Sequence, residues 1–268
     1  MKKTQRQIVE EKFHDTYAAS MDLKDVNIRE NFSFAAQENR MARNTFGNLK
    51  GKKVLDLGCG FGETAVYWAL KGADVEAIDI SSKSIALAKK LAAKNKVWKN
   101  CKFQTMTAEN LKFKDQYFDY VFGNGVLHHV DLNKAAKEIY RVLKPGGKGI
   151  FVEPLAYNPI INIYRIIADT VRTPMEKPLT FKQIDSMAKF FTTVAHREYE
   201  CLTLIIFVWF FIVARISPNE ERYWRKILTL RGSQKAVLKV LINLDKILLK
   251  LLPPAKYFCW NTVVEVVK

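Results

Sequence analysis

Residues 54–62 read Val-Leu-Asp-Leu-Gly-Cys-Gly-Phe-Gly, an apolar run that passes through an acidic residue into three glycines at alternate positions. The apolar run predicts a buried strand, and residues 63–70 after it predict a helix. Glycines at such a junction let the backbone turn sharply and let a ligand lie against the main chain, toward which the first helical amides point. Dinucleotide sites use the spacing G-x-G-x-x-G. Here the spacing is G-x-G-x-G and Glu63 stands at the sixth position, which disfavours a dinucleotide.

The chain after this stretch alternates between runs typical of strands and patterns typical of helices. Strands are predicted at 54–57, 74–80, 101–105, 120–124 and 149–153, and helices at 63–70, 84–95 and 133–143. Such alternation predicts an α/β fold, a parallel sheet with helices on both faces. Because ligands of these sheets bind beyond the carboxyl ends of the strands, residues 56–62, Asp79 and 123–125 are expected to face one crevice.

The remaining segments suggest additions to this core. Two late strands are predicted at 192–199 and 260–267, which would complete a seven-stranded, mostly parallel, Rossmann-like sheet. The expected organisation is an N-terminal helical lid, a core with a Pro- and Tyr-containing cap segment, an apolar and basic helical insert, and the last strand of the sheet. Their predicted bounds are 1–50 for the lid, 51–200 for the core, 154–190 for the cap, 201–255 for the insert and 256–268 for the last strand.

Four motifs in this order resemble those of class I S-adenosylmethionine (SAM) methyltransferases, in particular the type 11 domain of the ubiquinone/menaquinone C-methylases. They are the glycine stretch, Thr107-Ala108-Glu109-Asn110-Leu111-Lys112-Phe113, Gly123-Asn124-Gly125-Val126-Leu127-His128-His129-Val130 and Leu143-Lys144-Pro145-Gly146-Gly147. The resemblance covers about residues 45–153. It implies a SAM-dependent methyltransferase with SAM as its cofactor.

The resemblance also implies which residues contact SAM. Asp79 ends the second predicted strand and is expected to accept hydrogen bonds from the ribose hydroxyls. The related enzymes carry an acid where this chain has Thr107, so the adenine contact is expected to be weaker there. The implied cofactor-binding residues are Asp56, Gly58, Cys59, Gly60, Asp79, Ile80, Thr107, Ala108, Glu109, Asn124, Gly125 and His129.

Three residues are candidates for the group that removes a proton from a hydroxyl acceptor, a step that methyl transfer to oxygen requires. His129 follows the fourth strand beside the expected methyl donor, and histidine titrates in the useful range. His14 would reach the pocket if the N-terminal helices form a lid. Glu153 ends the fifth strand. Each has a plain alternative: His129 shapes its loop, His14 lies on the surface, and Glu153 anchors the substrate or pairs with Arg172.

The charge of the chain favours an anionic partner. Lys and Arg number 43 against 27 Asp and Glu, a formal net charge of +16, which suits nucleic acid, an acidic substrate or a membrane surface; a lysine-rich proteome gives the same excess. Basic and aromatic residues are not interleaved as in a nucleic-acid module. Residues 124–127 also lack the Asn/Asp-Pro-Pro-Tyr/Phe pattern of enzymes that methylate bases, so nucleic acid is disfavoured.

The acceptor is therefore expected to be a small or lipid- or glycan-linked molecule, methylated on oxygen rather than on carbon or nitrogen. Two alternatives stay open: a methyltransferase that acts on protein or RNA, and a SAM-binding module without turnover. The four cysteines form no C-x-x-C pair, so neither a metal site nor a disulfide is expected. Free thiols suit a reducing cytoplasm. The oligomeric state is left open.

The insert from Cys201 to Leu252 suggests a membrane surface. Its first part is uncharged but too short to span a bilayer. Residues 235–252 combine a lysine stripe with Val, Leu and Ile, a pattern of interfacial helices and equally of a core-packing helix with a solvated lysine face. Two apolar segments in one insert favour peripheral binding to an anionic membrane, at its inner face for a cytoplasmic protein. Mutual packing of the two segments without lipid is the alternative.

Overall fold

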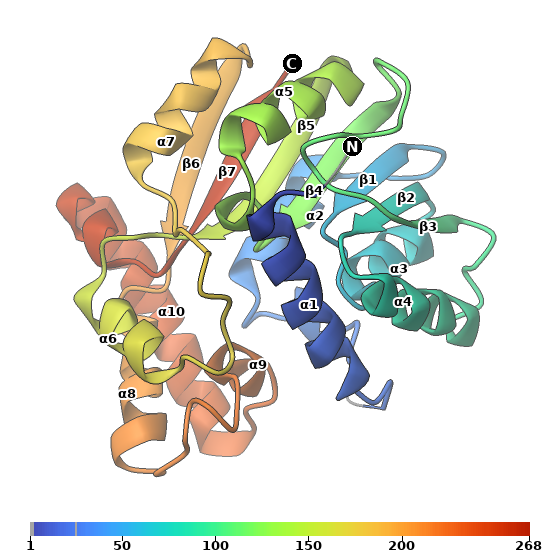
Figure 1. The fold of residues 1–268 in the computed structure, drawn as a ribbon. Coiled ribbons are helices and arrows are strands. Elements are labelled where there is room, and N and C mark those ends of the chain that lie inside the picture. Colours follow the sequence, from blue (N-terminus) through green and yellow to red (C-terminus); the bar gives the residue numbers. More distant parts are fainter. Residues whose placement is uncertain (1–2, 25) are drawn as a thin grey trace.

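Seven strands form one sheet in the computed structural model, which describes residues 3–24 and 26–268 (Figure 1). They are β1 (Lys53–Leu57), β2 (Asp74–Asp79), β3 (Cys101–Thr105), β4 (Phe118–Asn124), β5 (Leu143–Pro154), β6 (Thr193–Tyr199) and β7 (Asn261–Val267). Their order across the sheet is β3-β2-β1-β4-β5-β7-β6. The first five are parallel, and β7 runs antiparallel between β5 and β6. The predicted Rossmann-like, mostly parallel sheet is confirmed.

Helices cover both faces of this sheet and one end of it. They are α1 (Gln5–Ala19), α2 (Gln37–Phe46), α3 (Glu63–Leu70), α4 (Ser82–Lys94), α5 (Leu132–Val142), α6 (Pro159–Ile167), α7 (Phe181–Asp185), α8 (Ile205–Ile212), α9 (Tyr223–Leu228) and α10 (Gly232–Leu251). Short 3-10 turns add η1 (Glu30–Phe32), η2 (Leu127–His129), η3 (Ser186–Lys189), η4 (Leu202–Leu204) and η5 (Pro253–Phe258). Among the described residues, no helix has both the length and the apolar character that crossing a membrane requires.

Strand β1 is buried on both faces, as expected for a strand inside a parallel sheet. Because side chains alternate along a strand, Val54 packs with α2, α3 and α4, whereas Leu55 and Leu57 pack with α5 and α7. Asp56 therefore shares the α3 face, where the Thr64 hydroxyl donates to its carboxylate at 2.6 Å. The sequence pattern of β1 thus determines which core each residue joins.

Side-chain caps start the helices that surround the crevice. The Ser81 hydroxyl accepts from the Ser84 N–H at the start of α4, Asp131 caps α5, and Asn158 caps α6. Such caps satisfy backbone donors that a helix cannot satisfy itself. They place the first turn of each helix close to a strand end or to the segment that follows β5.

The fifth strand differs from the prediction. The sequence predicts a strand at 149–153, after the matched segment 143–147, but β5 already begins at Leu143 and includes that segment. Leu143 pairs with Phe118, and the register with β4 then shifts before Tyr120 pairs with Lys148. The glycines of this segment, with Gly146 at φ 73°, form an irregularity within the strand instead of a separate turn.

The insert does not stand apart from the core. Its helices α8, α9 and α10 lie together below the sheet in Figure 1, next to α6. Phe207, Tyr223 and Leu238 from these three helices share one buried cluster with Ile161 of α6 and Ala35 before α2. Packing among these segments closes the end of the sheet at which the strand tips lie.

Candidate active site

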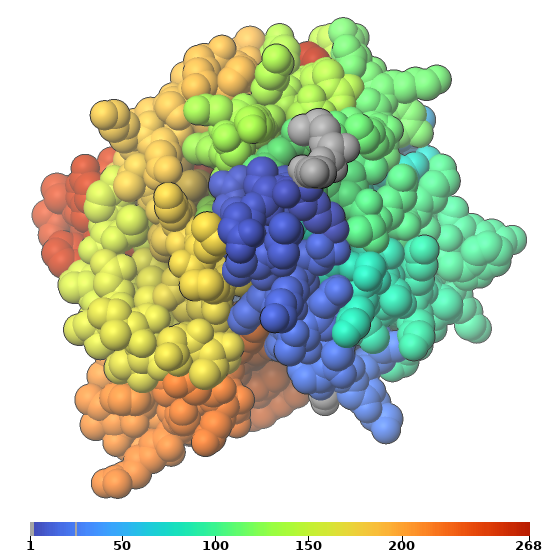
Figure 2. Space-filling view, viewed as in Figure 1, coloured from blue at the N-terminus to red at the C-terminus, as the bar shows by residue number. Residues whose placement is uncertain are grey.

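A cavity of about 470 Å³ opens beyond the carboxyl ends of β1, β2 and β4. Besides the strand ends, α1, α2, the segment after β5, and α9 contribute to its walls. Figure 2 shows α1, in blue, lying between the yellow segment near residue 180 and the teal and green core. The cavity is therefore covered by elements that lie far apart in the sequence.

Most of the predicted cofactor-binding residues line this cavity. They are Gly58, Cys59, Gly60, Asp79, Ile80, Thr107, Ala108, Glu109, Asn124, Gly125 and His129. Asp56 lies outside the set of described residues that line it, and only 1% of it is exposed. Burial, reinforced by the charges of Glu63 and Asp79, raises the pKa of Asp56 to about 7. Its place beneath the glycines favours support of the loop over contact with a ligand.

The glycine loop has the shape of a ligand cradle. Gly58, Gly60 and Gly62 all have positive φ, which side chains disfavour. A Cβ at Gly58 would overlap the Val126 side chain, whereas a Cβ at Gly60 would meet no described atom within 4 Å. At Gly60 the bare main chain therefore faces open cavity, and a ligand as large as SAM can approach it directly.

Asp79 connects the second strand to this loop. One carboxylate oxygen accepts from the Gly60 N–H at 2.9 Å, and the other accepts from the Ser81 N–H at 2.8 Å. Burial raises the pKa of Asp79, against the opposing effects of His14 and these two N–H groups. The remaining lone pairs of the carboxylate are available to hydroxyl donors of a ligand.

Helix α1 is attached to the core at two points. Near its start, Arg6 and Gln7 donate to Glu109, which also accepts from the Asp131 N–H at 2.7 Å. Near its end, Asp15 accepts from the Ser81 hydroxyl at 2.6 Å. Glu109 thus joins the lid to the core, a role that the sequence alone did not indicate.

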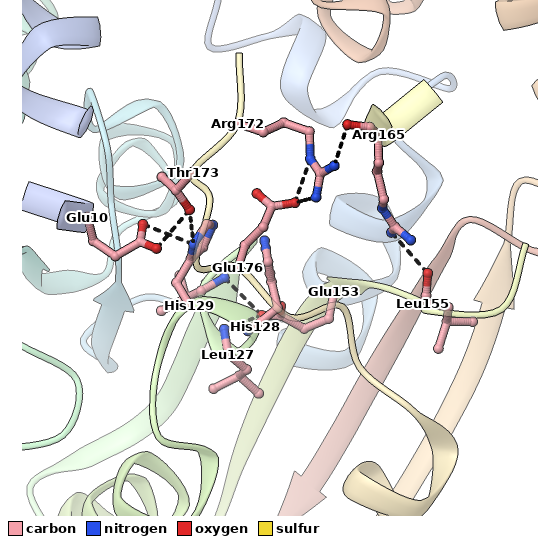
Figure 3. A network of polar contacts seen from close by, with 11 residues as sticks. Glu10, Leu127, His128, His129, Glu153, Leu155, Arg165, Arg172, Thr173 and Glu176 are labelled. Atoms are coloured by element: carbon pink, nitrogen blue, oxygen red, sulfur yellow. Dashed lines mark hydrogen bonds and ion pairs between the residues drawn. The ribbon is translucent and has the colours of Figure 1, made fainter. Parts of the chain in front are cut away.

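Between these two attachments, α1 brings Glu10 against His129 (Figure 3), and His14 of the same helix lies beside both. The Glu10 Oε2 atom lies 3.1 Å from His129 Nδ1 and 3.7 Å from His14 Nε2. The Thr173 hydroxyl donates to Glu10 Oε1 at 2.7 Å and lies 3.3 Å from His129 Nδ1. The two predicted histidines therefore meet in the cavity, around a carboxylate that is 3% exposed.

The charges of this cluster are coupled. Burial acts to raise the pKa of Glu10, but contacts with His129, His14 and Thr173 outweigh it and hold the pKa well below its usual range. Burial, with a contribution from neighbouring His128, lowers the pKa of His129. A neutral His129 beside an ionised Glu10 is therefore the expected state at neutral pH.

The structure does not support Glu153 as a proton acceptor. Its side chain is completely buried and lies outside the described residues that line the cavity. Its oxygens accept from the backbone N–H groups of Val126, Leu127 and His128 at 2.7–3.2 Å and lie 2.7 Å from His128 Nδ1. Because all these contacts hold η2, Glu153 positions the loop that carries His129.

The suggested pair of Glu153 with Arg172 also does not form. Arg172 binds Glu176 and donates to the Arg165 carbonyl oxygen at 3.0 Å (Figure 3). Glu176 itself lines the cavity, and its carboxylate lies close to the rings of His128 and His129.

Sequence reasoning missed Glu10 and Thr173. Glu10 stands one helical turn before His14, a spacing that places both on one face of α1, and this was the only available signal. The donor atoms of Glu10, His14 and His129 lie within 4.8 Å of one another, so this set could also ligate a metal ion. A short sequence motif cannot reveal such a metal site, because His129 lies more than a hundred residues after Glu10 and His14 in the sequence.

Comparison with known families agrees with this geometry. The family described as "Methyltransferase domain" matches residues 55–151, which contain the glycine loop, Asp79 and η2. This segment is a class I SAM-dependent methyltransferase domain. Curated relatives of the chain include the ubiquinone/menaquinone biosynthesis C-methyltransferase UbiE of Rickettsia felis, 39% identical over 107 residues. A ubiquinone biosynthesis O-methyltransferase of Pseudomonas syringae is 34% identical over 122 residues.

These matches cover less than half of this chain. The match to UbiE covers 37% of this chain and 43% of that protein, and the match to the O-methyltransferase covers 45% and 51%. The chain thus spans about half the length of the curated relatives or less.

Solved structures extend the likeness of fold to the whole chain. Geranyl diphosphate C-methyltransferase from Streptomyces coelicolor A3(2), solved with S-adenosyl-L-homocysteine, has a TM-score of 0.61 at 13% identity, covering 100% of this chain and 99% of that one. Phosphoethanolamine N-methyltransferase 2 of Haemonchus contortus has a TM-score of 0.59 at 20% identity, covering 96% and 59%. At such identities the likeness concerns the fold.

Proposed function

We propose that this protein is a SAM-dependent methyltransferase that transfers a methyl group to the oxygen of a small or lipid- or glycan-linked acceptor. The observation that carries the proposal is the position of the Glu10–His129 pair in the same cavity as the glycine loop and Asp79. One wall suits the methyl donor, and the facing wall holds a group that can take a proton.

The residues of the cavity have separate roles in this proposal. Gly58, Gly60 and Asp79 hold SAM, which supplies an electrophilic methyl group and leaves as S-adenosylhomocysteine. The Glu10 carboxylate favours the tautomer of His129 with its proton on Nδ1, which leaves Nε2 to accept the proton of the acceptor hydroxyl. Glu10 is thus a positioning residue, and α1 excludes water from the reacting groups.

The enclosure of the cavity favours a small acceptor over protein or RNA. Its volume lies within the range of small-molecule sites, about 300–1,000 Å³. Helix α1 is attached to the core through Glu109 before the Glu10–His129 pair and through Asp15 after it. A folded macromolecule would have to displace this helix to reach His129, whereas a small molecule or the end of a lipid-linked chain would not.

The proposal is tested by incubating the protein and radiolabelled SAM with lipid, small-molecule, protein and RNA fractions. Label in the lipid or small-molecule fraction, lost with His129→Ala, is the expected result. Label in protein or RNA would contradict the acceptor class. SAM binding by calorimetry without label in any fraction would favour a binding module without turnover.

We also propose that the protein binds the inner face of an anionic membrane through the insert. Helix α10 carries an apolar stripe that is exposed in the described part of the chain: Val237, Val240, Leu244, Ile247 and Leu251 are 43–76% exposed. Lys235, Lys239, Lys246 and Lys250 form the adjacent stripe and are exposed as well. An apolar stripe beside a cationic one suits the interface of an anionic bilayer.

Neighbouring helices extend the apolar surface. Helices α6 and α8 lie side by side in Figures 1 and 2. Ile163 and Ile166 of α6 are 59% and 78% exposed, and Ile212 of α8 is 65% exposed. Inner faces of α8 and α10 do pack together in a buried cluster, so mutual packing accounts for part of the apolar sequence and leaves the outer faces to explain.

Liposome flotation tests the membrane proposal. The protein is expected to float with vesicles of phosphatidylcholine and phosphatidylglycerol. The double variant Leu244→Ser/Ile247→Ser should bind about thirtyfold less, since each of the two lost apolar contacts contributes about 1 kcal/mol. Leu70→Ser removes an equally exposed leucine, 53% exposed, outside the insert and should bind normally. Equal flotation with pure phosphatidylcholine, or with the double variant, would contradict the proposal.

A further inference from the structure

Four arginines line the cavity in the described chain, and all lie in segments outside the methyltransferase domain match. They are Arg165, Arg172, Arg222 and Arg225. Two of them have carboxylate partners: Arg172 pairs with Glu176, and Arg225 lies 3.2 Å from Glu63. The other two cations have no such partner.

Arg222 is held by an aromatic ring. Its guanidinium lies 3.7 Å from the centre of the Tyr17 ring of α1, a cation–π contact. No carboxylate among residues 3–24 and 26–268 lies within 4.0 Å of its nitrogens. Burial, together with the nearby charge of Arg225, lowers its pKa. The group is still protonated at neutral pH, because an arginine does not lose its proton there.

Arg165 is held by neutral acceptors. It donates to the Asn162 side chain at 2.8 Å. It also donates to the Leu155 carbonyl oxygen at 2.9 Å, the contact drawn in Figure 3. Here too, the described chain places no carboxylate within 4.0 Å of the guanidinium. Burial, with the adjacent charge of Arg172, lowers its pKa to about 10. These two hydrogen bonds fix the position of the guanidinium without neutralising it.

The Glu176 carboxylate acts on both guanidinium groups from a longer distance, but it is already paired with Arg172. Two partly desolvated cations beside the cavity therefore destabilise the empty site, because a charge removed from water without a partner of its own costs free energy. An anionic ligand would supply that counter-charge. A guanidinium offers paired donors that match the oxygens of a phosphate. Apolar groups surround the same space, so the ligand's remaining surface is expected to be apolar: Ile161, Val171, Trp224, Leu228 and Trp260 line the cavity.

We propose that the methyl acceptor carries a phosphate group that binds Arg222 and Arg165, with an apolar portion against the neighbouring side chains. This inference rests on the proposed methyltransferase function. Two sources share this chemistry, a lipid-linked phosphate and a free phosphorylated small molecule. Helix α6 carries Arg165 toward the cavity and Ile163 and Ile166 toward solvent, so the phosphate subsite adjoins the surface proposed to meet the membrane.

Calorimetry on the full chain loaded with S-adenosylhomocysteine tests the phosphate subsite. Octyl phosphate is expected to bind at least tenfold tighter than octyl glucoside, which has the same chain and no charge. Arg222→Gln and Arg165→Gln should each lose at least tenfold of the octyl phosphate affinity and keep the S-adenosylhomocysteine affinity. Arg215→Gln is the matched control, because Arg215 is exposed on the insert outside the cavity lining, and it should bind as the wild type does.

Inorganic phosphate distinguishes the two sources. Binding as tight as that of octyl phosphate supports a free phosphorylated acceptor, and binding at least tenfold weaker supports a lipid-linked one. Equal affinity for octyl phosphate and octyl glucoside in the wild type would overturn the proposal, and this comparison needs no variant. So would loss of S-adenosylhomocysteine affinity in Arg222→Gln with octyl phosphate unchanged, since Arg222 would then serve the cofactor. A wild-type protein that binds no S-adenosylhomocysteine overturns the proposed function instead, and octyl phosphate titrated without cofactor still tests the subsite.

Discussion

The two walls of the cavity are built in different ways. The donor wall consists of strand ends and the loops that follow them, and Gly60, Asp79 and Asn124 reach it directly from β1, β2 and β4. The acceptor wall is assembled from α1, the segment after β5, and α9, which side-chain contacts such as Asp15 to Ser81 hold in place. The comparison teaches that the backbone positions the proposed donor site, whereas long-range side-chain contacts position the proposed acceptor site.

The largest effect is expected from a substitution in the donor wall. Asp79→Ala removes two charge-assisted hydrogen bonds to Gly60 and Ser81 together with the proposed ribose contact. The loss of these contacts should cost about 4 kcal/mol of binding free energy in total. The SAM affinity measured by calorimetry should therefore fall about 1,000-fold. Asp74→Ala, at the opposite end of β2, is the matched control and should bind SAM normally. Near-normal affinity of Asp79→Ala would remove Asp79 from the site.

A smaller effect is expected at the acceptor wall. His129→Ala removes the proposed proton acceptor, so kcat should fall about 100-fold while SAM affinity changes less than threefold. His196→Ala, on β6 beside Glu198, should leave both values unchanged. An unchanged kcat for His129→Ala would show that the reaction needs no base at this position.

The pH dependence sharpens the same point. Because burial lowers the pKa of His129, the neutral base form persists below pH 6.5, and the acidic limb of kcat/KM should lie below that value. Glu10 acts to raise the pKa of His129, so Glu10→Gln should move this limb to still lower pH while reducing kcat. If the acidic limb stays at the same pH in Glu10→Gln, then a group other than His129 causes it.

The smallest of these effects concerns the attachment between the two walls. Asp15→Asn weakens the contacts of α1 with the Ser81 hydroxyl and the Lys83 N–H. The loss should be about 1.5 kcal/mol, the lower end for hydrogen bonds to a charged group. Acceptor KM should rise about tenfold, with faster hydrogen exchange in α1. Asp22→Asn, after the same helix and 57% exposed in its side chain, should change neither. Normal exchange with a raised KM would argue that Asp15 acts on the acceptor and not through the lid.

The residues of the donor wall could be predicted from the sequence much more completely than those of the acceptor wall. The strands, the glycine loop and Asp79 follow from hydrophobic period and turn chemistry within short stretches, so local patterns were sufficient for them. Asp56 and Glu153 lie in strands that end at the cavity, as the sequence predicts. The direction in which their side chains point, however, depends on packing. Asp56 turned toward Thr64, and Glu153 toward the amides of η2.

The sequence by itself determined the sheet with helices on both faces, the methyltransferase domain and the residues next to the glycine loop at Gly60. Only the tertiary structure decided that Glu10 meets His129, that Arg222 lies over Tyr17, and that α6 joins the insert. The physical reason is range. A strand end and its loop are specified by neighbouring residues, whereas contacts across a hundred residues depend on how the helices pack, and no local period records that packing.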